Sequence, residues 1–140
     1  MTLIKRSVMT LYSGTDKFSH QVRWVLAEKG VGVEIIIVDV NHPCEDLARL
    51  NPYNTLPTLV DRDLVLYHAD VIMEYLDERF PHPPLLPVYP VARAKSRLMI
   101  HRIKRDFYSM IDAIETDRNP VVVDQVSNEL REGLIALDPV

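Results

Sequence analysis

The amino-acid sequence predicts an α/β domain followed by an all-α domain. Up to residue 80, short runs of β-branched and apolar residues alternate with segments whose apolar residues recur at helical spacing. After residue 91 the spacing is helical, and a proline-rich segment separates the two regions. We therefore expect one domain at residues 1–80, a linker at 81–91 and a second domain at 92–140.

The first domain is predicted to open with a βαβ unit. A strand-like run at residues 7–12 ends at the turn Ser13-Gly14, and apolar residues follow helical spacing across residues 18–30. Residues 33–40 are nearly all apolar or β-branched, as in a buried strand. Strand, helix and buried strand in this order predict a parallel pair of strands.

A hairpin and two further helices complete the first domain. Residues 45–50 are expected to form a short helix, and strands at 58–61 and 64–67 are joined by a tight turn. A helix at 70–80 places apolar residues on one face and charged residues on the other. The order β-α-β-α-β-β-α, with a proline before the third strand, predicts a thioredoxin-like domain.

Two long helices make up the predicted second domain. Apolar residues recur every three or four positions across residues 92–115 and again across 121–137. This period is typical of helices that bury one face. We therefore expect the second domain to be all-α.

Composition argues against several classes of function. A formal net charge of −4 gives no electrostatic basis for a nucleic-acid coat. No run approaches about 18 apolar residues and the first residues lack the order of a signal peptide, so we expect a cytoplasmic protein without a membrane span. The single cysteine, Cys44, excludes an internal disulfide, and the scattered histidines and four glycines predict neither a metal site nor a cofactor.

Half of the ten prolines lie between residues 81 and 90, in a segment that we call the proline strap (residues 81–91). Each proline fixes its φ and removes a donor, so we expect a semi-rigid, extended segment outside regular structure. It is either a passive connector or a docking surface. Docking is favoured by the small conformational entropy that prolines lose on binding. The docking residues would be Pro81, His82, Pro83 and Pro84, with Tyr89 as an aromatic anchor.

Several stretches resemble a known family. They read KRSVMTL from Lys5, SHQVR from Ser19, VLAEKG from Val25, PTLVD from Pro57 and IMEYLDERFPHPP from Ile72, and PVYPVAR follows from Pro87. On these stretches the chain resembles the glutathione-transferase family, and within it the bacterial stringent starvation protein A group, over nearly its whole length.

The resemblance implies a noncatalytic regulator of transcription that associates with RNA polymerase and its primary sigma factor during starvation. It implies a homodimer that contacts DNA only through the polymerase. It also implies a helical domain longer than residues 92–140, so we expect this one to be truncated. A dimerisation or scaffold module is a further alternative.

Because of this resemblance, the residue at the start of the first helix indicates whether the chain keeps transferase chemistry. Transferases place a hydroxyl or thiol there, because the helix N-H groups and dipole stabilise a thiolate. This chain has Asp16, whose charge would repel a thiolate. Thr15 is the remaining candidate for the hydroxyl that a transferase has at this position. We nevertheless expect that Thr15 or Ser13 simply caps the helix.

The other two glutathione anchors give a mixed result. A Glu-Ser or Gln-Ser pair that would hold the γ-glutamyl group is replaced by His68 and Ala69. Leu56 and Pro57 survive, and we expect the bond between them to be cis. We therefore expect a vestigial glutathione site and no catalytic residue. The alternative is a glutathione-dependent transferase or reductase with weak activity that uses Thr15.

A basic stretch follows the proline strap and contains no acidic residue before Asp106. A solvated helix face is the ordinary interpretation of such a stretch. The alternative is an electropositive patch for an acidic partner surface, for DNA near a promoter complex or for an anionic nucleotide. Its members would be Arg93, Arg97, Arg102 and Arg105.

Overall fold

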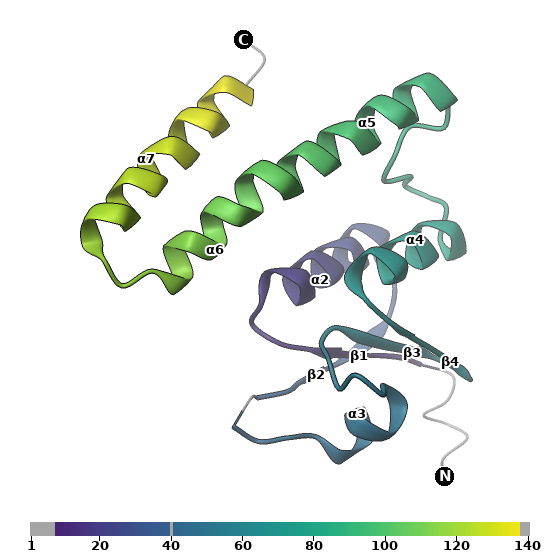
Figure 1. Cartoon of the computed structure of the whole chain (residues 1–140). Coiled ribbons are helices and arrows are strands. Elements are labelled where there is room, and N and C mark those ends of the chain that lie inside the picture. The colour runs from purple at the N-terminus through teal and green to yellow at the C-terminus, as the bar shows by residue number, and fades with distance from the viewer. Residues whose placement is uncertain (1–7, 40, 138–140) are drawn as a thin grey trace. The chain divides into compact units, whose positions relative to one another are not determined.

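The structure is a computed structural model that describes residues 8–39 and 41–137 (Figure 1). The chain forms two compact units, Met1–Leu85 and Leu86–Val140, and each is described by itself. The first is an α/β unit and the second is all-helical, so the predicted fold class is confirmed. The boundary between the units falls inside the proline strap, and the predicted bounds of the linker stay a prediction.

A four-stranded mixed sheet forms the centre of the first unit. Its strands lie in the order β2 (Val33–Ile37), β1 (Met9–Ser13), β3 (Thr58–Asp61) and β4 (Leu64–Tyr67). β1 is parallel to β2 and antiparallel to β3, and β3 and β4 form the predicted hairpin. Helix α2 (Lys17–Lys29) connects β1 to β2, so the predicted βαβ unit is present. The expectation that its second strand is buried is wrong, because β2 is an edge strand on which Ile35 and Ile37 are exposed.

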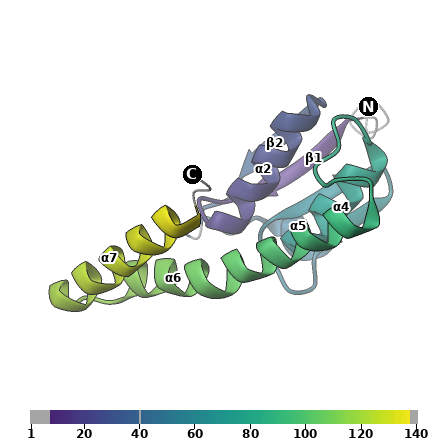
Figure 2. The same ribbon diagram turned by 90° about the horizontal axis from the view of Figure 1, so that it is seen from above.

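Helices α2 and α4 (Ala69–Arg79) pack side by side on one face of the sheet (Figures 1 and 2). Helix α3 (Glu45–Leu50) lies on the opposite face. The core between the sheet and the helix pair consists of alternate strand residues and one stripe from each helix, as periodicity predicts. Its buried members are Met9, Leu11, Val22, Leu26, Leu59, Ala69, Ile72 and Leu76.

The ends of some strands differ from the predicted ends. β2 ends at Ile37, because the chain turns at Asp39, whose carboxylate accepts the N-H of Asn41 at 3.0 Å. Ser7 and Val40, which belong to predicted strands, lie outside the described residues. The strands of the hairpin and helix α3 have the bounds that the sequence predicts.

Two tyrosines of the first unit have a raised pKa. Tyr75 of α4 donates its phenol hydrogen to Asp61 Oδ2, and this bond, followed by burial, raises the pKa of Tyr75. Burial, followed by the negative charge of Asp46, raises the pKa of Tyr12. The bond from Tyr75 to Asp61 ties α4 to the end of β3.

A buried asparagine shapes the loop that leads into β3. Asn51 Nδ2 donates to Thr55 O, Thr55 Oγ1 and Thr58 Oγ1 at 3.0 to 3.1 Å, and Asn51 Oδ1 accepts the N-H of Tyr53 at 2.9 Å. Both polar atoms of this fully buried side chain therefore have partners. The loop carries Pro57 into β3, and the peptide bond before Pro57 is cis, as predicted.

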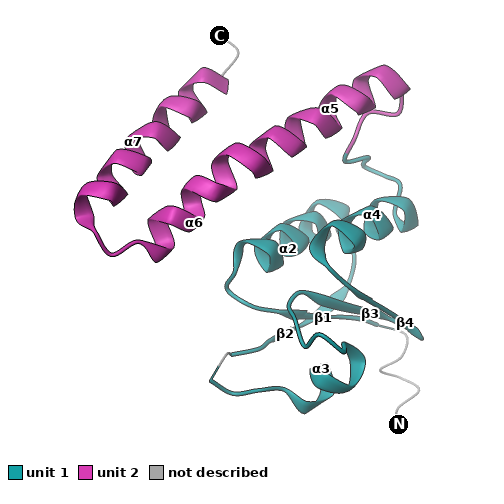
Figure 3. Ribbon diagram, viewed as in Figure 1, with its two compact units in different colours: residues 1–85 teal, residues 86–140 magenta. Residues whose placement is uncertain are grey.

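The second unit, shown in magenta in Figure 3, is a helical hairpin. It comprises α5 (Pro90–Ile103), a π-helical turn η1 (Lys104–Tyr108), α6 (Ser109–Thr116) and α7 (Pro120–Leu137). The first predicted helix is thus a continuous rod that contains a π turn, which its spacing did not indicate. No described helix is long and apolar enough to span a membrane.

The start of α5 corrects the expectation that every proline of the strap lies outside regular structure. Pro90 is the first residue of the helix. A proline is tolerated there because the N-H that it lacks has no partner in the first turn, and its fixed φ suits a helix. The last residues of the strap are therefore helical.

A close approach in the second unit depends on a glycine. A Cβ placed on Gly133 of α7 would lie 2.6 Å from Cε1 of Phe107 in η1. A larger residue at position 133 would therefore displace the Phe107 ring from its place against α7. Even so, none of the side chains in the described residues 86–137 is fully buried.

We predict that Asn51→Ala lowers the free energy of unfolding by about 2 kcal/mol, because it leaves buried partners without a hydrogen bond. Urea denaturation followed by circular dichroism measures this change. Glu74→Gln, on the exposed face of α4, is the control and should change the value by less than about 0.5 kcal/mol. A loss as small as the control's would contradict a structural role for the Asn51 network.

Candidate functional site

The residues of the predicted glutathione site lie along one edge of the sheet. β1 and β4 are both antiparallel to β3, so they run in the same direction and end at the edge where β3 begins. Asp16 follows β1, His68 follows β4 and Pro57 precedes β3. Helices α2 and α4 therefore both begin at this edge, which we call the helix-start edge.

The start of α2 is capped by a carboxylate. Asp16 has extended backbone angles, and its Oδ2 accepts the N-H of Ser19 at 3.1 Å. Its Oδ1 accepts the hydroxyl hydrogen of Ser19 at 2.7 Å, and Ser19 Oγ accepts the N-H of Gly14 at 3.0 Å. A helix N-H that could face a ligand's thiolate is thus bonded to a carboxylate of the chain itself.

The expectation that Thr15 or Ser13 caps this helix is wrong. Because α2 begins at Lys17, the residue in the capping position is Asp16. Thr15 is exposed, whereas Ser13 is buried at the end of β1.

An arginine and a glycine close the corner between β1 and α2. Arg23 Nη1 donates to Ser13 Oγ and to the carbonyl oxygen of Gly14, the latter at 2.6 Å. A Cβ on Gly14 would lie 2.9 Å from both Asp16 Oδ1 and Leu56 Cδ1. Asp16 and Leu56 therefore both lie close to Gly14. Arg23 was not singled out from the sequence, although it lies one turn after Ser19 in the stretch SHQVR.

His68 has a strained backbone. Its φ is 78° and its ψ is 120°, and no hydrogen bond from its side chain caps α4. Such a conformation costs a residue other than glycine about 1 to 3 kcal/mol. The side chain of His68 is exposed and Ala69 is buried in the core, so this pair offers a ligand neither an anion nor a hydroxyl.

The first residues of the predicted docking surface lie at the other end of the helix pair. In the proline strap, Pro81, His82, Pro83 and Pro84 are all exposed. Tyr89, the fifth predicted docking residue, is 78% exposed and belongs to the second unit. Within the first unit the strap therefore presents a continuous exposed run.

A buried ion pair anchors the strap to the ends of α2 and α4. Lys29 Nζ lies 2.7 Å from Asp77 Oδ1, and the Lys29 side chain has no exposed surface. The same Nζ donates to the carbonyl oxygen of Pro83 at 2.6 Å, and Asp77 Oδ1 also accepts the N-H of Leu85 at 3.1 Å. We call these three hydrogen bonds the Lys29–Asp77 clasp.

Sequence reasoning missed the clasp, although a signal for it exists. Val22, Leu26 and Lys29 are spaced four and three residues apart and are all buried on one stripe of α2. A lysine in the last place of an apolar stripe indicates a buried charge, and a buried charge requires a partner.

The arginines of the predicted basic patch divide into two pairs. Arg93 and Arg97 are four residues apart on α5 and share a face, whereas Arg97 and Arg102 are about 140° apart at roughly 100° per residue. Arg102 and Arg105 line a cavity of about 500 Å³ together with Asp106 and several apolar side chains.

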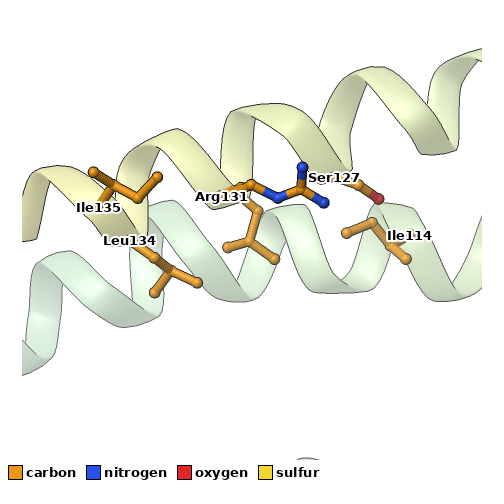
Figure 4. Close-up of a pocket in the computed structure, with 6 residues that line it drawn as sticks. Ile114, Ser127, Arg131, Leu134 and Ile135 are labelled. Carbon is orange, nitrogen blue, oxygen red and sulfur yellow. The ribbon is translucent and has the colours of Figure 1, made fainter.

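An apolar groove of about 460 Å³ lies between α6 and α7 (Figure 4). Ile114 lines it from α6, and Leu130, Leu134 and Ile135 line it from α7. Arg131 and Ser127 are its polar members. Few polar groups converge there, so the groove lacks the parts of a catalytic site. In the described part of the chain, no three His, Cys, Asp or Glu side chains are grouped to hold a metal ion.

Comparisons with known proteins agree with this architecture. Residues 7–78 match the family "Glutathione S-transferase, N-terminal domain". A stringent starvation protein A homolog of Coxiella burnetii is 63% identical over 139 residues, which cover 99% of this chain and 66% of that protein. A homolog of Pasteurella multocida is 58% identical and is matched over 97% of this chain and 64% of its own length. The predicted resemblance is confirmed, and the chain spans slightly less than two thirds of these relatives.

A solved structure shows the same fold. Glutathione transferase Omega 3C from Trametes versicolor matches 97% of this chain and 61% of its own chain with a TM-score of 0.81. The two sequences are 20% identical, so this likeness concerns the fold alone.

We predict that His68→Gly raises the free energy of unfolding by about 1 kcal/mol, because glycine adopts a positive φ without a Cβ clash. His68→Ala keeps the Cβ and should give no such gain, which makes it the matched control. Urea denaturation of both variants measures the difference. Equal stability of the glycine and alanine variants would show that the backbone at His68 is not strained.

Proposed function

The chain belongs to the glutathione S-transferase family through its N-terminal domain, and we propose that it is a noncatalytic regulator of transcription. In this proposal it binds RNA polymerase and the primary sigma factor in the response to starvation, as a homodimer that meets DNA only through the polymerase. The observation that carries the proposal is the Asp16 cap, which occupies the point where a transferase needs a thiolate. The high identity to stringent starvation protein A homologs supports it.

The helix-start edge supports the noncatalytic half of the proposal. The carboxylate of Asp16 accepts a backbone N-H and a hydroxyl hydrogen, and a thiolate beside it would be repelled. His68 and Ala69 supply no anion for a ligand ammonium group. Loss of one charge-assisted hydrogen bond costs about 1.5 to 3 kcal/mol, which is roughly one to two decades of affinity.

The proline strap supports the docking half of the proposal. Pro81 to Pro84 are exposed and are attached to the first unit by the Lys29–Asp77 clasp. Exposed proline rings offer apolar surface with no backbone donor to desolvate, and their fixed dihedral angles reduce the entropy lost on binding. His82 adds a group that donates or accepts a hydrogen bond within this surface.

A weak glutathione-dependent transferase or reductase is the second candidate function. The observation that favours it is the position of Thr15. Because Asp16 occupies the capping position, the exposed hydroxyl of Thr15 is not used as the helix cap. In this alternative, Thr15 would donate a hydrogen bond to the glutathione sulfur.

We predict that replacing Pro81, His82 and Pro83 by alanine abolishes the capture of RNA polymerase holoenzyme by the full chain. The variant should keep its circular dichroism spectrum, because these side chains are exposed and contribute little to the core. Substitution of the exposed residues Arg62 and Asp63 by alanine, in the hairpin turn of the same unit, is the control. Retained capture by the strap variant would refute the docking surface.

We predict that isothermal titration calorimetry detects no submillimolar binding of glutathione, because two of the three anchors are absent. Thr15→Ala and Thr15→Ser are compared with the unmodified chain. Binding that disappears in Thr15→Ala and persists in Thr15→Ser would establish the second candidate function instead.

A further inference from the structure

We propose that Lys29 and Asp77 are positioning residues, which hold the proline strap in the conformation that binds its partner. The inference rests on the proposed function of the strap. It goes beyond that function because neither residue is exposed enough to be a principal contact. The Lys29 side chain is fully buried, and that of Asp77 is 17% exposed.

The clasp uses the few backbone groups by which the strap can be held. Among residues 81–85, only His82 and Leu85 have a backbone N-H, because the other three are prolines. The N-H of Leu85 is bonded to Asp77, and the carbonyl oxygen of Pro83 is bonded to Lys29. The strap is therefore fixed on both sides of Pro84, which is the last residue of the proposed docking run from Pro81 to Pro84.

The chemistry of the two side chains suits this task. A lysine ammonium has three donors, so Lys29 can bond to Asp77 and to Pro83 O at the same time. One carboxylate oxygen of Asp77 accepts from both Lys29 and Leu85. Hydrogen bonds that involve a charged group are shorter and stronger than neutral ones, so the two strap bonds are well suited to hold the backbone.

Stability alone does not explain a buried ion pair at this place. An apolar pair of similar volume often stabilises a protein equally well or better, because both charges must be desolvated. An apolar pair could not bond to the backbone at residues 83 and 85. What Lys29 and Asp77 contribute, and an apolar pair could not, is that they fix the path of the strap backbone. A strap that is ordered before binding loses less entropy when the partner binds.

The test is the full-length double variant Lys29→Met with Asp77→Leu, which removes both charges and keeps similar volumes. We expect it to fold, because neither charge is left unpaired. The exchange rate of the Leu85 amide, measured by NMR, should rise at least tenfold, and the Kd for RNA polymerase holoenzyme should rise about tenfold. Tyr75→Phe is the control, since it removes a hydrogen bond from α4 that does not involve the strap.

The outcomes separate this inference from the proposed function. Faster exchange at Leu85 together with weaker binding supports the inference. Normal binding by the double variant, when the alanine variant of Pro81, His82 and Pro83 has lost binding, overturns the inference alone. Normal binding by both variants overturns the proposed function. Weaker binding with unchanged exchange at Leu85 also overturns the inference, because the strap would then be ordered without the clasp.

A second pair of variants tests the same idea outside the buried ion pair. Leu85→Pro removes the N-H that bonds to Asp77, and Leu85→Ala keeps this N-H but shortens the side chain. We expect binding of the holoenzyme to weaken about tenfold in Leu85→Pro relative to Leu85→Ala. Equal Kd values for the two variants would overturn the role of the Leu85 amide, even if the double variant failed to fold.

Discussion

The packing of α2 against α4 on one face of the sheet is the constraint on which both surfaces of the first unit depend. Leu26, Ile72 and Leu76 are buried between the two helices and the sheet. Because β1 and β4 run in the same direction, the two helices begin at one edge of the sheet and end at the other. One packed pair of helices thus positions the helix-start edge at one end and the proline strap at the other.

The two ends of this helix pair use polar groups in different ways. At the helix-start edge, Ser19 donates to Asp16 and accepts the N-H of Gly14, and Arg23 donates to the carbonyl oxygen of Gly14. These donors therefore have partners within the same corner of the chain. At the other end, Lys29 and Asp77 direct their bonds outward to the strap. The polar groups at the helix-start edge are thus bonded within their own corner, whereas those at the other end hold the backbone of the strap.

The sequence was sufficient where one physical rule decides the structure, and insufficient where two rules compete. The hairpin strands and α3 have their predicted bounds, because turn residues and apolar alternation agree there. The run Ser13-Gly14-Thr15-Asp16 contains three residues that cap helices well, and only the observed start of α2 selects Asp16. The π turn η1 was not predicted, because apolar residues spaced three and four apart also occur in a continuous α-helix. The burial of Lys29 was not predicted, because lysine is almost never fully buried unless it is paired, and its partner lies 48 residues away along the chain.

A proline-rich segment is stiff along its length but has few groups by which a domain can hold it. Prolines supply carbonyl oxygens and no N-H, so the domain must supply the donor, and a lysine ammonium is a strong one. Burial of that ammonium is unfavourable unless an anion accompanies it, and Asp77 is this anion as well as the acceptor for Leu85. The donor comes from α2 and the acceptor from α4, so the strap is held correctly only when the two helices are packed together. The proposed docking surface is thereby coupled to the core, although no residue of that surface belongs to the core.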